Sequence, residues 1–237
     1  MRQILIPKLS PYNHLFPDPR KASVEGLVAF GGDLHPDRVL RAYREGIFPW
    51  YSEGDPILWW SPDPRLLLYP DQIKISRSLK KSLKKFSVTA DKAFGKVIRS
   101  CRMVRMGDTW ILPEIIEVFE ELHERGFAHS IEVWRGEELV GGLYGLSMGA
   151  AFFGESMFSL VRDASKVALV RLCEISKEFG FDFIDCQVPS EHLKRMGAVE
   201  VPRDIFLDQL KQALTKPSQI GKWNFKYESA TLQNKKG

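Results

Sequence analysis

Residues 128–158 constrain the fold of this chain more than any other part of its sequence. They contain three β-rich runs, 128–134, 139–147 and 150–158, separated by two short turns. Runs of this length, rich in Val, Ile, Phe and Tyr and bounded by glycine or charged residues, are typical of strands. Because connections this short join antiparallel neighbours, the segment predicts a three-stranded meander.

Helical patterns surround this meander. Apolar residues recur at helical spacing over 164–179, Gly180 ends the pattern, and a short apolar strand follows at 182–188. Further helices are expected at 36–45, 76–86, 113–125, 191–196 and 205–214. We therefore expect an α+β fold, in which helices pack on a sheet.

The composition changes along the chain and suggests three parts. Residues 1–65 are crowded with proline, glycine and aromatic residues, which predicts a small N-terminal α/β lobe. Residues 66–214 carry the meander and most of the helices, and they are expected to form the main domain. Residues 215–237 are polar and are expected to be a tail with limited order.

Several classes of protein do not fit the composition. A chain of 237 residues, of which 44% are hydrophobic, can bury a core without cross-links. Its three cysteines, Cys101, Cys173 and Cys186, are odd in number and widely spaced, which indicates neither a disulfide framework nor a metal site. We find no apolar segment long enough for a membrane span or a secretory signal, so a soluble, cytoplasmic protein is expected.

Positive charge is concentrated in one expected helix. The net charge is only +4, but five basic residues lie close together without an acidic residue between them: Arg77, Lys80, Lys81, Lys84 and Lys85. A charged helix face is usually solvated surface, whereas a cluster of this kind also suits the phosphate backbone of a nucleic acid. The residues alone leave both interpretations open.

Several unusual strings occur together in this sequence. They are Gly31-Gly32-Asp33-Leu34, Gly46-Ile47-Phe48-Pro49-Trp50-Tyr51, Trp59-Trp60-Ser61-Pro62-Asp63-Pro64-Arg65, Thr109-Trp110-Ile111, His129-Ser130-Ile131-Glu132-Val133-Trp134, Gly154-Glu155-Ser156-Met157-Phe158-Ser159 and Ile184-Asp185-Cys186-Gln187-Val188. In order and spacing they resemble the leucyl/phenylalanyl-tRNA-protein transferases, over roughly residues 26–210.

This resemblance implies a fold, a reaction and partners. The main domain would be GNAT-like, the fold of acyl-CoA N-acyltransferases. The enzyme, an aminoacyltransferase, would move Leu or Phe from leucyl- or phenylalanyl-tRNA to the N-terminal amine of proteins that begin with Arg or Lys, and so create a degradation signal of the N-end rule. Ester aminolysis requires positioning and charge stabilisation rather than a metal, so no cofactor is expected. A monomer is expected.

Three polar residues are the candidate catalytic groups. Asp185 and Gln187 lie two apart on an apolar strand, where the strand period points both to one face. The resemblance implies that Asp185 polarises Gln187 while the amine attacks, although Asp185 could instead satisfy buried backbone donors. Glu155 follows an apolar run in which an ionised carboxylate needs a partner. It could hold an ammonium group, or form a structural salt bridge with Arg162 or Lys166.

The resemblance also assigns places to other parts of the donor. Four residues match the pocket for the aminoacyl side chain: Leu143, Met157, Ser159 and Leu172. By pattern the three apolar ones are equally ordinary core residues. Trp50 and Trp110 match positions at the terminal adenosine, where stacking of a base on an aromatic ring contributes about 1 to 3 kcal/mol. A tRNA donor would make the basic helix the candidate for phosphate contacts.

The chain departs from the family pattern at Lys74, where histidine is usual, at Leu160, where arginine is typical, and over residues 102–108. Arg162 could replace the arginine missing at Leu160. Two other functions stay open, an acetyltransferase that uses acyl-CoA and a tRNA-binding protein without catalysis. Residues 159–163 lack the glycine-rich turn that would bind the CoA pyrophosphate, and the intact catalytic candidates argue against the second alternative.

Overall fold

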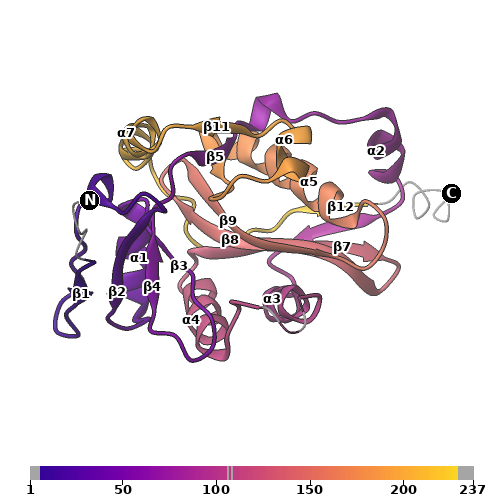
Figure 1. Cartoon of the computed structure of the whole chain (residues 1–237). Helices are drawn as coiled ribbons and strands as arrows, with labels where there is room; N and C mark the ends of the chain where they lie inside the picture. Colours follow the sequence, from indigo (N-terminus) through magenta and orange to yellow (C-terminus); the bar gives the residue numbers. More distant parts are fainter. Residues whose placement is uncertain (1–5, 106, 108, 229–237) are drawn as a thin grey trace, which may run out of the picture.

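The computed structural model describes residues 6–105, 107 and 109–228, and these form two sheets (Figure 1). The first sheet has the order β1 (Lys8–Leu9), β2 (Leu27–Gly31), β4 (Leu58–Trp60) and β3 (Phe48–Pro49). The second has the order β11 (Val199–Val201), β5 (Arg65–Leu68), β10 (Phe183–Asp185), β9 (Ala151–Ser159), β8 (Glu138–Met148), β7 (Ala128–Arg135), β6 (Ser87–Ala90) and β12 (Lys226–Tyr227).

The helices are α1 (Pro36–Arg44), α2 (Arg77–Ser82), α3 (Phe94–Met103), α4 (Pro113–Glu124), α5 (Ala164–Phe179), α6 (Glu191–Arg195) and α7 (Arg203–Ala213), with short 3-10 turns at Pro19–Lys21 and Pro70–Gln72. The described chain is therefore a mixed arrangement of sheets and helices, as expected. Within it, no helix combines the length and the apolarity that a bilayer crossing requires.

The predicted meander is confirmed as β7, β8 and β9, which pair antiparallel in sequence order. Leu143 lies opposite Met157, and Tyr144 lies opposite Ser156. The pairing shifts between Tyr144 and Gly145, where a Cβ atom would come within 2.1 Å of the Phe153 carbonyl oxygen. Glycine at 145 thus allows the two long strands to stay paired past this irregularity.

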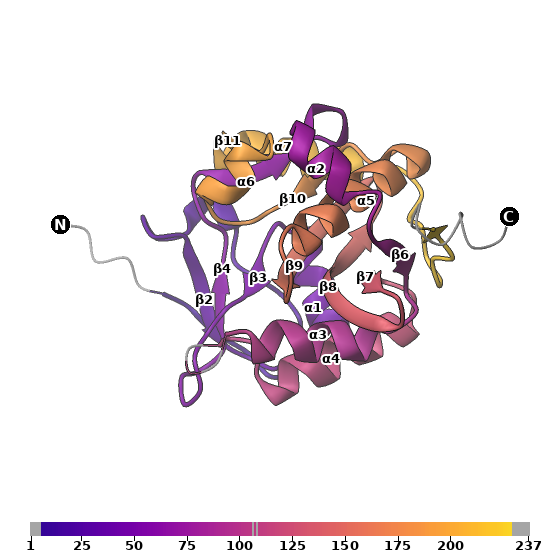
Figure 2. The same ribbon diagram turned by 90° about the vertical axis from the view of Figure 1, so that its right-hand side faces the viewer.

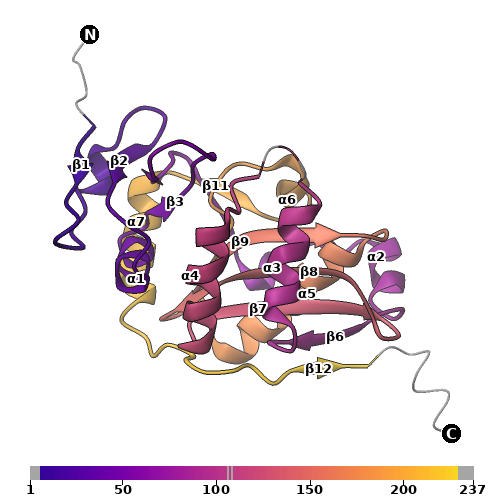
Figure 3. The same ribbon diagram turned by 90° about the horizontal axis from the view of Figure 1, so that it is seen from below.

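Helices cover both faces of the second sheet. The predicted helix over 164–179 is confirmed as α5, which lies on one face and ends at Gly180, a residue in the left-handed region with φ of 69°. Figures 2 and 3 show α3 and α4 together on the opposite face. Two apolar cores result, one on the α5 side and one that joins α3 and α4 to α1 and the first sheet.

Two helical predictions need correction. The helix expected over 76–86 is shorter, because Ser76 caps α2 through its hydroxyl and the chain leaves the helix to place the buried Phe86 before β6. Helix α3 was not predicted, although its apolar residues Phe94, Val97, Ile98 and Cys101 follow helical spacing and are buried. The predicted helix over 36–45 is confirmed as α1, with Pro36 in its first turn.

The expectation of limited order after residue 214 is wrong for residues 215–228. Trp223 is only 4% exposed, its ring stacks on His129 with centroids 3.9 Å apart, and its backbone N–H donates to Asp91 at 2.8 Å. Strand β12 then pairs with β6. The polar composition of this segment gave no sign that one aromatic residue, Trp223, anchors it. Residues 229–237 lie outside the described part of the chain.

Replacing Trp223 with alanine should lower the free energy of unfolding by about 3 kcal/mol or more, because a buried indole is lost and a cavity remains. Urea unfolding followed by circular dichroism measures this change. Tyr12→Ala is the matched control, since Tyr12 is 95% exposed and its removal should leave stability within about 0.5 kcal/mol of the wild type. Equal stability of Trp223→Ala and the wild type would show that residues 215–228 do not contribute to the core.

Candidate active site

A cavity of about 350 Å³ opens where β9 and β10 separate. The two strands pair in parallel only up to Phe153 and Asp185. Two residues later Gln187 has a φ of 64°, in the left-handed region, which turns the chain away from β9. Residues 154–157 form one wall of the resulting gap and residues 186–188 form the other. The volume suits a small-molecule site.

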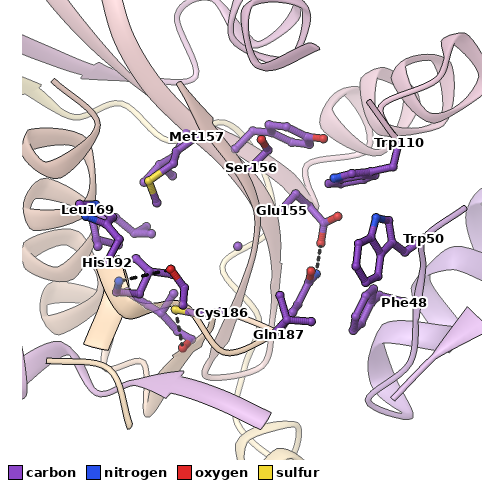
Figure 4. Close-up of a pocket in the computed structure, with 18 of the residues that line it drawn as sticks. Phe48, Trp50, Trp110, Glu155, Ser156, Met157, Leu169, Cys186, Gln187 and His192 are labelled. Carbon is purple, nitrogen blue, oxygen red and sulfur yellow. Dashed lines mark hydrogen bonds between the residues drawn. The ribbon is translucent and has the colours of Figure 1, made fainter. Parts of the chain in front are cut away.

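The cavity passes from one face of the sheet to the other. Its apolar end lies on the α5 side and is lined by Leu143, Met157, Leu169, Leu172, Ile184 and Leu193. Its aromatic end lies toward the first sheet and is lined by Phe48, Trp50 and Trp110. Figure 4 shows these two groups on opposite sides of Glu155 and Gln187. The geometry separates an apolar recess from an indole-lined one by a pair of polar side chains.

Glu155 is the centre of the polar pair. Its Oε1 accepts hydrogen bonds from the Tyr43 hydroxyl at 2.6 Å and from the Gln187 amide nitrogen at 2.7 Å. Oε2 is buried and has no partner among the described residues. Burial raises the pKa of Glu155 to about 8, and the charge of Asp185 adds to this shift while the hydrogen bonds oppose it. The carboxyl group can therefore gain or lose a proton near neutral pH.

Asp185 forms a buried ion pair with Arg65. Nε of Arg65 donates to Oδ1 at 2.9 Å and Nη2 donates to Oδ2 at 2.6 Å, and both side chains are fully buried. The guanidinium lies between the rings of Phe48 and Phe206. Oδ1 of Asp185 also accepts the backbone N–H of Gln187 at 2.8 Å. This carboxylate consequently holds the backbone that carries Gln187 in the cavity wall.

Two expectations for these acids are wrong. Asp185 and Gln187 do not point to one face, because β10 ends at Asp185, and the amide of Gln187 contacts Glu155 while Asp185 reaches only its backbone. The alternative, that Asp185 satisfies a buried backbone donor, describes the observed contact. Arg162 and Lys166 do not pair with Glu155, since both face Asp163, at 3.9 and 3.0 Å. Arg162 therefore does not take the place suggested for the residue missing at Leu160.

The structure brings most of the other candidates together. Leu143, Met157, Leu172, Trp50 and Trp110 all line the cavity.

Ser159 does not line the cavity, contrary to expectation. It is exposed at the end of β9, where its hydroxyl donates to the Val161 carbonyl oxygen and accepts the N–H of Ser165. The five basic residues are exposed on α2 and the turn after it, outside the cavity: Arg77, Lys80, Lys81, Lys84 and Lys85. Within the described ranges, no three His, Cys, Asp or Glu side chains are arranged to hold a metal ion.

The sequence analysis missed four residues at this site. Arg65 was quoted within a string but given no role, although a cation that begins an apolar strand needs a buried partner. Tyr43 lies within the helix expected over 36–45, and its hydroxyl contact with Glu155 spans 112 positions. Arg105 and His192 line the cavity. No local pattern in the sequence marks any of these long-range contacts.

Comparisons with known proteins agree on one family. The model of the leucyl/phenylalanyl-tRNA protein transferases matches residues 67–211, and the model of their N-terminal domain matches residues 32–63. A leucyl/phenylalanyl-tRNA–protein transferase of Legionella pneumophila (strain Lens) is 56% identical over 215 residues, covering 90% of this chain and 97% of that protein. The Myxococcus xanthus enzyme of the same name is 55% identical over 214 residues, covering 88% and 92%.

Solved structures are more distant. An aminoglycoside acetyltransferase from an uncultured soil metagenomic sample aligns with a TM-score of 0.36 at 13% identity, covering 61% of this chain and 97% of that one, which is too remote to carry an argument. The family models together span most of the sequence, and the curated relatives match it nearly end to end. This chain belongs to the leucyl/phenylalanyl-tRNA protein transferase family.

Proposed function

We propose that this protein transfers Leu or Phe from aminoacyl-tRNA to the N-terminal amine of proteins that begin with Arg or Lys, and so creates a degradation signal of the N-end rule. Membership of the family supports the reaction. The observation that carries it in this chain is the cavity between β9 and β10, where Glu155 and Gln187 separate an apolar end from an indole-lined end. An aminoacyl ester of adenosine has the same three parts in the same order.

The finer organisation belongs to the same proposal. The main domain is GNAT-like, which is supported by the unit β9–α5–β10, in which a helix joins two parallel strands that then diverge around a site. The boundary between the two lobes stays near residue 65, where β5 begins at Arg65 and enters the second sheet, and residues 215–228 go with the main domain because β12 pairs with β6. The enzyme acts as a monomer in the cytoplasm, where charged tRNA and nascent or cleaved proteins meet.

The donor fits the cavity with its side chain at the apolar end. Leu143, Met157 and Leu172 surround the Leu or Phe side chain, and the flexible thioether of Met157 accommodates both shapes. Trp50 and Trp110 stack on or beside the adenine. This arrangement places the ester carbonyl next to the Glu155–Gln187 pair, at the narrow crossing of the sheet.

The acceptor amine attacks the ester carbonyl carbon from this crossing. A C–N bond forms, the bond from the carbonyl carbon to the ribose oxygen breaks, and that oxygen leaves with a proton. Glu155 receives the proton that the attacking amine loses and passes it to the leaving ribose oxygen, which its near-neutral pKa allows. Gln187 donates to Glu155 through its amide nitrogen, which leaves its amide oxygen to orient the amine. Asp185 is a positioning residue, because it acts through the backbone of Gln187.

The five basic residues on and after α2 bind tRNA phosphates. They are exposed, and the helix that carries them packs near the start of α5, where Ser82 donates to Asp163 at 3.0 Å. Contacts with phosphate carry no sequence information, which suits an enzyme that accepts several leucine and phenylalanine tRNAs.

Single-turnover transfer from leucyl-, phenylalanyl- and methionyl-tRNA to peptides that begin with Arg, Lys or Asp tests the proposed reaction. We expect product with leucyl and phenylalanyl donors and with Arg or Lys acceptors, and less with the other combinations. A parallel arm with acetyl-CoA tests the acetyltransferase alternative. Acetylation without aminoacyl transfer, or tight tRNA binding without any product, would overturn the assignment.

Replacing Glu155 with glutamine should reduce kcat/KM by about 100-fold or more, because a general base is lost while an amide oxygen can still accept both hydrogen bonds. The pH profile gives a second readout. As pH rises through about 8, Glu155 loses its proton, and the acceptor amine becomes neutral at nearly the same pH. Below pH 7 the slope of log kcat/KM against pH should approach 2 in the wild type and 1 in the variant. A slope of 2 in both would exclude Glu155 as the base.

Replacing Lys80 and Lys84 with glutamine should weaken use of aminoacyl-tRNA without affecting transfer from phenylalanyl-adenosine, which has no phosphate backbone. The slope of log kcat/KM against log salt concentration should become shallower by about 1 to 2 units, since two phosphate contacts are lost. Lys96 and Lys211, also exposed, provide the matched double variant. An unchanged dependence of kcat/KM on salt in the Lys80/Lys84 variant would show that the basic face of α2 is solvated surface and does not contact tRNA.

A further inference from the structure

Arg105 is a cation in the cavity lining for which the described part of the chain provides no acidic partner. It follows α3 and lines the cavity with Trp110, which comes from the same connection between α3 and α4. Among the described residues no carboxylate lies within 4 Å of its guanidinium, and it does not pair with Glu155, the acidic residue of the cavity lining. A cation that is half-buried and unpaired beside aromatic rings is a site for an anionic ligand group.

The adjoining wall supplies hydroxyl groups. Tyr144 and Ser156 lie opposite each other on β8 and β9; the Tyr144 hydroxyl is buried without a hydrogen-bond partner among the described residues, and the Ser156 hydroxyl lies beside the Cys101 thiol. Burial raises the pKa of the Cys101 thiol to about 12, the Ser156 hydroxyl and the charge of Arg105 oppose that shift, and Arg105 also opposes the rise for the Tyr144 hydroxyl. The charge of Arg105 thus acts on groups of this wall, and Figure 4 shows Ser156 between Met157 and Trp110.

We propose that Arg105 binds the 5′-phosphate of the terminal adenosine of the donor and thereby positions its ester. This rests on the proposed function. In an aminoacylated terminal nucleotide the amino acid has lost its carboxylate to the ester, its α-amine is neutral or cationic, and adenine and ribose are neutral. The phosphodiester is the remaining anion. It leaves the ribose on the nucleotide side, the end of the cavity lined by Trp110, and Arg105 belongs to the same connection between α3 and α4 as Trp110.

The geometry also argues against two other ligand groups. A guanidinium would repel the α-ammonium, so Arg105 does not hold the amino group of the donor. The apolar end, which is proposed to hold the donor side chain, lies on the opposite side of β9. Arginine matches a phosphate with two parallel N–H donors, a geometry that lysine lacks. Arg105 is thus a positioning residue that reads the presence of a phosphate and not the base sequence.

Two small donors test the inference without the rest of tRNA. They are phenylalanyl-adenosine and phenylalanyl-adenosine 5′-phosphate, each with a peptide acceptor that begins with Arg. Because a hydrogen bond to a charged group is lost without the phosphate, the wild type should prefer the phosphorylated ester by about tenfold or more in kcat/KM. In Arg105→Gln this preference should fall to less than about threefold, because the loss of kcat/KM falls mainly on the phosphorylated ester.

Arg102→Gln is the matched control, since Arg102 lies one turn earlier on α3 and does not line the cavity. It should keep the wild-type preference. Arg105→Lys should keep part of it through the charge alone. Melting temperatures within a few degrees of the wild type would show that the variants fold.

Three outcomes would overturn the inference. They are equal use of both esters by the wild type, a full phosphate preference in Arg105→Gln, and an equal loss with both esters in that variant, which would place Arg105 at the ribose or the ester. Binding of AMP and adenosine, measured by calorimetry, is an independent arm. If neither ester reacts, the proposed function fails, whereas tighter binding of AMP than adenosine that disappears in Arg105→Gln would still support the phosphate subsite.

Discussion

The buried ion pair between Arg65 and Asp185 is the interaction on which the site depends. Arg65 is the first residue of β5, directly after the segment that leaves the first sheet, and Asp185 is the last residue of β10. Arg203 contacts the same segment twice. Its guanidinium donates to the Ser61 carbonyl oxygen, and its backbone N–H donates to the Asp63 carboxylate. Removing one partner of a fully buried pair leaves an uncompensated charge, at a cost of about 3 to 5 kcal/mol. The pair therefore couples the junction of the sheets to the end of β10, where the cavity begins.

The same pair affects the pKa of Glu155. Burial raises this pKa to about 8, and the charge of Asp185, which Arg65 binds through two hydrogen bonds, adds to the shift. Two nearby carboxyl groups thus have different surroundings, since Asp185 is paired with a guanidinium while Glu155 accepts from the neutral Tyr43 and Gln187. Without Asp185, Gln187 would lose the hydrogen bond that anchors its backbone, and Glu155 would lose a charge that raises its pKa.

The sequence predicted the parts of the fold that depend on local patterns. The meander and α5 follow from strand alternation, helical spacing and the stop at Gly180, and the structure matches these predictions closely. Contacts between distant segments were not predictable in this way. Arg65 and Asp185 are 120 positions apart, and the positive φ of Gln187, which turns its side chain into the cavity wall, has no local signal in a run that resembles a strand.

The resemblance to a family identified the residues that line the cavity better than apolar spacing did. It did not predict which side chains contact one another. Leu143, Met157 and Leu172 are ordinary core residues by spacing, and only the divergence of β9 from β10 makes them the wall of a cavity. Ser159 belongs to the same quoted string as Met157, yet two further residues along β9 carry it out to the start of α5. The point at which two strands stop pairing therefore indicates which residues line the cavity better than position within a motif does.

The apolar end of the cavity also limits how selective the proposed donor site can be. A purely apolar pocket distinguishes one methylene more or less by about 1 to 3 kcal/mol, and it rejects polar side chains because they lose hydrogen bonds there. The protein would then exclude other charged tRNAs by the size and polarity of the attached amino acid, which would contact Leu143, Met157 and Leu172. Recognition of the nucleotide at the opposite end is common to every tRNA. In the proposed mode of binding, a cavity that crosses the sheet would assign these two tasks to separate cores, and the donor side chain could vary between Leu and Phe while the ester stays beside Glu155 and Gln187.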